Sequence, residues 1–154
     1  METLAGRIRR ELDELGVVAE RTSRIWNSIP LDPDDFRVDA VAINLHGLYS
    51  GVERVFEQIA DRVDGSMPLG SNWHRELLVQ MASEIPGTRP PVISSDLFLR
   101  LDSLRGFRHV VRNVYTYVLD RRQVQVLIDD MPSTLTMLRG ELESFAELLE
   151  VLAT

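Results

Sequence analysis

Apolar residues recur at steps of three and four along most of this 154-residue chain, which is the spacing of one face of an α-helix. Prolines and glycines interrupt the pattern, and no stretch reads as a strand of a βαβ unit. The interruptions predict helices over these ranges: 1–28, 32–64, 71–83, from 94 or 95 to about 120, and 121–154. We therefore expect an all-α fold, an up-and-down antiparallel bundle of four to five helices, in a single domain spanning residues 1–154.

Short motifs mark where several of these helices begin and end. Asp32 followed by Pro33 predicts the start of the second helix, and Gly65 predicts its end. Serines are the expected N-caps of the third and fourth helices: Ser71, and Ser94 or Ser95. Pro132 predicts a kink or break in the last helix, because proline lacks the N–H that the helix needs.

The composition argues against several classes of function. No run approaches the ~20 apolar residues of a membrane-spanning helix, and the first residues lack the apolar segment of a secretory signal, so we expect a cytoplasmic protein. The chain has no cysteine, and its three histidines are scattered: His46, His74 and His109. Phosphate-loop, dinucleotide, nucleophile-elbow and zinc motifs are absent. We therefore expect no metal site and no cofactor, a structural or surface role for His46, and a capping or packing role for His74.

The formal net charge of −7 argues against a protein that coats nucleic acid through its phosphates, but it does not exclude a local site. All 17 basic residues are arginine. A coding bias would explain this. We favour that explanation, but selection for the paired hydrogen bonds that arginine makes to phosphate cannot be separated from it by the sequence alone, so both explanations stay open.

The stretch 104–118, LRGFRHVVRNVYTYV, contains three arginines, a histidine and two tyrosines but no acid. Spaced at about 100° per residue on a helix, its residues form two arcs. The apolar arc holds Leu104, Phe107, Val110, Val111, Val114 and Val118, and the polar arc holds Arg105, Arg108, His109, Arg112, Asn113 and Tyr115. Arginines at intervals of three and four suit a bound phosphate. The alternative is a solvated basic face that acids on neighbouring helices neutralise.

Within this stretch, residues 108–115 (RHVVRNVY) resemble the signature of HEPN-domain ribonucleases, and in particular of HepT-like toxins. That signature is an arginine, four residues of which the first is polar, a histidine, one residue and a tyrosine. Arg108, His109 and Tyr115 match it, and Asn113 stands at the histidine position. The resemblance extends more loosely over most of the chain, and the family's small dimeric helical bundle agrees with the fold predicted above.

The resemblance implies a metal-independent endoribonuclease whose composite site lies at a homodimer interface and acts on RNA such as tRNA. Arg108 would stabilise charge on the phosphate, with Arg105 and Arg112 binding phosphate beside it. The family's partner is a minimal nucleotidyltransferase (MNT) antitoxin. It would transfer AMP to Tyr115, which would place bulk and negative charge where the RNA phosphate should lie.

Asn113 departs from the family pattern, because an amide cannot exchange a proton near neutral pH. His109 could supply the proton transfer, which we favour because it lies on the polar arc. Asn113 could instead position RNA while the arginines give weak catalysis. In the third alternative the chain is a catalytically impaired HEPN dimer that serves as a binding scaffold for the nucleotidyltransferase or a nucleic acid.

Overall fold

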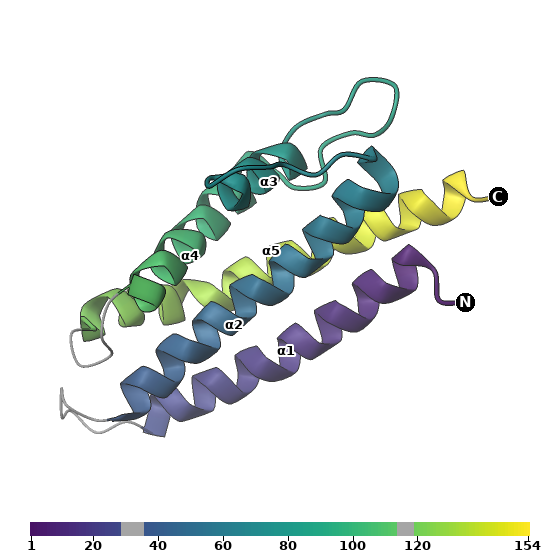
Figure 1. The fold of residues 1–154 in the computed structure, drawn as a ribbon. Coiled ribbons are helices and arrows are strands. Elements are labelled where there is room, and N and C mark those ends of the chain that lie inside the picture. Colours follow the sequence, from purple (N-terminus) through teal and green to yellow (C-terminus); the bar gives the residue numbers. More distant parts are fainter. Residues whose placement is uncertain (29–35, 114–118) are drawn as a thin grey trace.

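The computed structural model describes residues 1–28, 36–113 and 119–154, with residues 108–113 described by their backbone alone. It contains five α-helices and one π-helical turn (Figure 1): α1 Leu4–Ser28, α2 Phe36–Ile59, η1 Ala60–Asp64, α3 Trp73–Met81, α4 Ser95–Asn113 and α5 Arg121–Leu152. No strand occurs in these ranges, although Ile85 and Arg89 form an isolated antiparallel bridge. The prediction of an all-α bundle is confirmed.

The three long helices α1, α2 and α5 lie side by side, and α3 and α4 complete the bundle (Figure 1). Helix α1 packs against both α2 and α5, whereas α4 packs against α2, α3 and α5. Ion pairs fix the register of the neighbours: Arg9 of α1 meets Glu143 of α5, and Arg100 of α4 meets Asp130 of α5. Along α4 and α5 the contacts follow in opposite order, since Ser94 meets Glu141 and the later Arg100 meets the earlier Asp130, as antiparallel packing requires.

A single buried cluster of apolar side chains runs through all five helices. The described side chains of α4, residues 95–107, include four buried apolar ones, Leu97, Leu101, Leu104 and Phe107. Two of these, Leu104 and Phe107, belong to the apolar arc predicted from the sequence, and the other members of that arc lie outside the described side chains. The buried face of α4 therefore follows steps of four and three, the spacing of a helix packed against its neighbours.

Several predicted helix ends are confirmed. Gly65 ends the second helix with a left-handed backbone (φ 65°), a conformation that costs glycine little. The last turn before it, Ala60–Asp64, is a π-helix where the sequence predicts a continued α-helix. Ser94 caps α4, because the Leu97 N–H donates to its Oγ at 3.2 Å.

Other helix ends differ from the prediction. Helix α3 begins at Trp73 after Asn72, with no side-chain cap, so the prediction of Ser71 as its N-cap is wrong. Helix α5 passes through Pro132 as one element, so the helix is not broken there. The predicted start at residues 32–33 lies outside the described residues, as do residues 114–118 between α4 and Leu119.

The segment 82–94 and the groups that hold it, which we call the α3–α4 joint, position the start of α4. Arg89 donates from Nε to Asp64 Oδ1 at 2.6 Å and from Nη2 to Asp64 Oδ2 at 2.7 Å, and both side chains are 1% exposed. The same guanidinium also donates to the carbonyl groups of Ser83, Pro90 and Gln80. A buried charge that is fully hydrogen-bonded in this way fixes the loop in one conformation.

None of the helices in the described ranges is both long enough and apolar enough to cross a membrane.

Candidate nucleic-acid interface

The arginine-rich run predicted from the sequence lies on the second half of α4. The helix continues without interruption to Asn113, so positions 105, 108, 109, 112 and 113 share one helical backbone. The side chains of residues 108–113 are outside the described part of the structure, and so is the whole of Tyr115. The roles predicted for Arg108, His109, Arg112, Asn113 and Tyr115 therefore remain predictions.

The helical backbone of α4 relates position 108 to the residues that precede it. Leu97, Leu101 and Leu104 are all buried and follow one another at steps of four and three. The next step of four leads to Arg108, which falls within about 40° of all three leucines around the helix. Position 108 thus lies on the same helical face as these leucines, a relation that the stretch 104–118 alone does not reveal because Leu97 and Leu101 precede it.

Arg105 has a local partner that the predicted polar arc did not include. Its Nε lies 2.8 Å from Asp102 Oδ1, one helical turn earlier, with the two side chains 23% and 29% exposed. An ion pair this accessible to solvent contributes only about 0–1 kcal/mol. A phosphate can therefore compete with Asp102 for the guanidinium, although Arg105 is not the uncompensated cation that the sequence suggested.

The charge of the chain is distributed unevenly. Residues 100–122, which we call the cationic segment, contain six arginines and two aspartates, a formal charge of +4. Since the whole chain carries −7, the rest carries −11. Arg122, on the first turn of α5, has a side chain that is 95% exposed. A polyanion would therefore be attracted to the cationic segment and repelled by most of the remaining surface.

A pocket of about 360 Å³ opens between α4 and α5 within and beside the cationic segment. Its lining residues, which define the α4–α5 pocket, are Ser103, Gly106, Phe107, Gln123, Val126 and Leu127. The sequence reading missed its α5 side, because no local pattern says which residues of α5 come to lie opposite α4. One sequence signal could have indicated it: Val126 is apolar but lies off the helical stripe formed by Val124, Ile128 and Met131.

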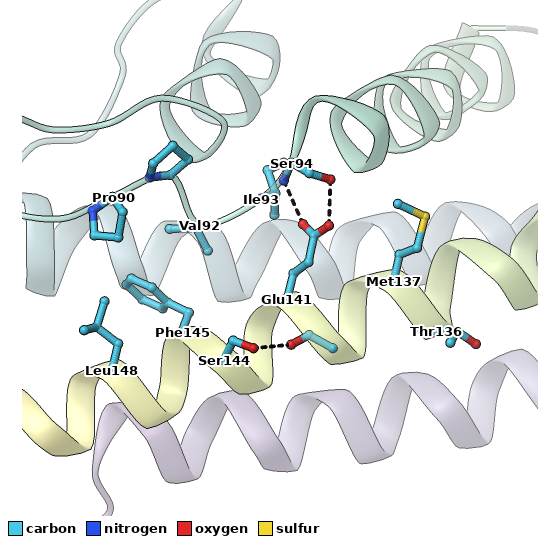
Figure 2. A pocket seen from close by; sticks show the side chains of 12 residues that line it. Pro90, Val92, Ile93, Ser94, Thr136, Met137, Glu141, Ser144, Phe145 and Leu148 are labelled. Carbon is cyan, nitrogen blue, oxygen red and sulfur yellow. Dashed lines mark hydrogen bonds between the residues drawn. The ribbon is translucent and has the colours of Figure 1, made fainter.

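A larger pocket, of about 660 Å³, lies at the other end of α4 between residues 90–94 and α5. Figure 2 shows Glu141 of α5 pointing at the start of α4, where it accepts hydrogen bonds from Ser94 N (2.7 Å) and Ser94 Oγ (2.6 Å). Both oxygens of that carboxylate are thus engaged in holding α4. The remaining lining is largely apolar, with Met137, Phe145 and Leu148 among its side chains.

Two histidines lie away from the cationic segment. His74 of α3 has its Nδ1 2.6 Å from Glu53 Oε2 of α2, and its ring stacks on Trp73 with centroids 3.7 Å apart. This joins α3 to α2, in agreement with the structural role expected from the sequence. His46 is half-buried on α2. In the described ranges no group of three or more histidine, cysteine or acidic side chains is placed to hold a metal ion.

These features define a small helical bundle with a locally cationic helix, and comparison with known protein families assigns the class. The family model described as "HepT-like protein" matches residues 40–149, which is more than two thirds of the chain and includes most of α2, all of α3 and α4, and most of α5. The chain belongs to this HepT-like family, as the resemblance of residues 108–115 predicts. No curated protein and no solved structure matches it.

Proposed function

We propose that this protein is a HepT-like toxin, a metal-independent endoribonuclease of the cytoplasm that cleaves RNA such as tRNA. The observation that carries the proposal concerns the motif run 108–115. It lies inside the matched region and in a strongly cationic segment of an acidic chain, and its residues 108–113 form the end of α4. Family membership supports the fold and the class of site. Charge supports a polyanionic substrate.

In the proposed reaction the 2′-hydroxyl of a nucleotide attacks the adjacent phosphorus. The new P–O2′ bond forms while the P–O5′ bond breaks, leaving a 2′,3′-cyclic phosphate and a 5′-hydroxyl. His109 takes the hydroxyl proton or donates one to the leaving oxygen, and Arg108 stabilises the charge that develops on the phosphoryl oxygens. Asn113 positions the RNA, and Arg105 and Arg112 bind the phosphate.

The proposed active form is a homodimer whose two sites share a groove. Support comes from apolar side chains that the single chain leaves exposed. Phe36 and Ile43 lie seven residues apart on α2, which places them on one face, and both are exposed. A second copy of the chain would bury such side chains.

Cleavage of RNA in the presence of EDTA tests the proposal directly. Replacing Arg108 with alanine should lower kcat/KM by about 10²–10³, the effect of removing one group that stabilises the transition state. Arg75→Ala is the matched control, because Arg75 is an exposed arginine on α3 outside the cationic segment. Equal activity of the two variants would remove Arg108 from the mechanism.

The proposed regulation is transfer of AMP to Tyr115 by a nucleotidyltransferase antitoxin of the MNT type. Protein produced together with such a partner should gain one or more AMP units in its intact mass, and Tyr115→Phe should abolish the gain. The added phosphate would compete with RNA for the arginines of α4. A gain that persists in Tyr115→Phe would move the modification to another residue.

Asn113 favours a second candidate function, a catalytically impaired HEPN dimer that acts as a scaffold for the nucleotidyltransferase or a nucleic acid. The loss of an acid–base group typically costs about 10²–10⁴ in rate. The scaffold should bind its partner stably and leave RNA intact even when enzyme exceeds substrate. Cleavage that Arg108→Ala abolishes would exclude it.

A further inference from the structure

We infer that the α4–α5 pocket binds a nucleobase of single-stranded RNA, the base of a nucleotide that flanks the scissile phosphate. This inference rests on the proposed function for its substrate class. It concerns a different set of residues from the motif run, all of them described in the structure: Ser103, Gly106, Phe107, Gln123, Val126 and Leu127.

The lining of the pocket suits a flat heteroaromatic ring. Phe107 and Leu127 supply apolar wall, and Val126 stands 67% exposed at the edge. Gly106 keeps the α4 side open, because a Cβ added there would meet nothing within 4 Å. The volume of about 360 Å³ lies at the small end of the range for ligand pockets, which fits one base better than a whole nucleotide chain.

Polar groups at the rim can read the edge of the base. Gln123 is exposed on the first turns of α5, and its side-chain amide offers both a donor and an acceptor. Ser103 faces it from α4, with a hydroxyl that donates to the Leu99 carbonyl and can still accept. An apolar slot with one amide at its mouth is how proteins hold an unstacked base and distinguish its edge.

The pocket opens next to the predicted catalytic positions. Gly106, position 109 and position 113 follow at steps of three and four, so they share one face of α4. Position 109 is about 4.5 Å and position 113 about 10.5 Å further along the helix axis than Gly106. If the scissile phosphate is bound at positions 109 and 113, the base that reaches the pocket therefore belongs to a neighbouring nucleotide.

The positive charge beside the pocket favours a nucleic acid over an uncharged ligand. Gly106 and Phe107 lie within the cationic segment, and Gln123 directly follows it. Arg122, one residue before Gln123, is 95% exposed and 3.9 Å from Asp120, so it can move to a phosphate. An aromatic and aliphatic slot beside an exposed arginine is a combination that binds single strands.

Photocrosslinking tests the pocket independently of catalysis. The full chain would be irradiated with a short single-stranded RNA that is 2′-O-methylated throughout, which prevents cleavage, and carries 5-iodouracil at one position in turn. Trypsin releases the two pocket walls as peptides 106–108 and 123–139, since arginines flank both. We expect crosslinks on these two peptides, and crosslinks only elsewhere would overturn the inference.

Cleavage of RNA with one abasic position gives the second measurement. One flanking abasic position should lower kcat/KM by about tenfold or more in the wild type, the equivalent of losing one stacked base. Gly106→Leu fills the pocket, and Val126→Glu alters its exposed edge without touching the core. Both should remove the dependence on that position. Gln123→Ala should change which base is preferred, whereas Gln125→Ala, two residues on, should not.

The outcomes separate this inference from the proposed function. Cleavage that ignores every abasic position would overturn the pocket and leave the ribonuclease intact. Crosslinks on both pocket peptides without cleavage of any RNA would overturn the ribonuclease and leave the base site. If crosslinks are absent and Gly106→Leu lowers the mass of an assembly measured by light scattering, a second copy of the chain covers the pocket, and the inference is wrong.

Discussion

The two ends of α4 use arginine in opposite ways. At the α3–α4 joint Arg89 is buried, forms a two-pronged pair with Asp64 and also meets three carbonyl groups. In the cationic segment arginines outnumber acids six to two, and Arg122 stands almost fully in water. A buried and saturated arginine fixes architecture, whereas an exposed arginine in local excess remains available to a ligand.

The largest expected effect tests the architectural end. Arg89→Ala leaves the Asp64 carboxylate buried without its cation, and breaking a buried pair in this way typically costs about 3–5 kcal/mol of unfolding free energy. Arg122→Ala, at the exposed end, should change it by less than about 0.5 kcal/mol. Urea unfolding of both variants makes the measurement. Equal losses would mean that burial does not distinguish the two ends.

The next effect concerns catalysis at the cationic end. Asn113→His restores the residue that the family motif carries, and a proton-transferring group there should raise single-turnover cleavage by about 10² if proton transfer limits the rate. Asn113→Gln is the control, because it changes size without adding an acid–base group. Similar rates in the two variants would mean that position 113 acts by positioning RNA. No cleavage in either would favour the scaffold.

A smaller loss of stability is expected from a substitution at the α3–α4 joint. Ser94 accepts from the Leu97 N–H and donates to Glu141, so Ser94→Ala removes both a helix cap and a tie to α5. The loss should be about 0.5–2 kcal/mol. Ser144→Ala is a suitable control on α5, because that hydroxyl only donates to the Gly140 carbonyl of its own helix. Thermal unfolding of the two variants should separate them by several degrees.

The sequence predicted the helices well because each depends on a local pattern. Gly65 and Ser94 act at helix ends through their own backbone or side chain, and both predictions are confirmed. Ser71 failed because a serine near a helix start need not form the cap: α3 begins two residues later, after Asn72, without one. Pro132 failed as a break because the packing of the rest of α5 outweighs one lost hydrogen bond.

The candidate site could be predicted only in part. Its motif residues are close together in the sequence, whereas the residues around them are brought together only by folding. The run 104–118 is visible in one stretch of sequence, and so is its resemblance to the family motif. The pairing of Arg105 with Asp102 lay just outside that window. The α5 wall of the α4–α5 pocket depends on how α4 and α5 align in antiparallel packing, as the Arg100–Asp130 ion pair shows. The sequence of one helix alone does not specify that alignment.

The smallest expected effect asks whether pairing without burial stabilises the fold. Arg9 of α1 donates to Glu143 at 2.6 Å and to Glu150 at 3.1 Å, both on α5, in a site open to water. The hydrogen bond from Arg9 holds the pKa of Glu150 below its ordinary value. A carboxyl whose pKa is lowered by folding stabilises the protein above its unfolded pKa, and the contribution is lost as pH falls through the folded pKa. Glu150→Gln should therefore reduce stability slightly at neutral pH and converge with the wild type in acid. Urea titrations at both pH values measure this, and a loss as large as that of Arg89→Ala would show that pairing alone, without burial, is what makes an arginine architectural.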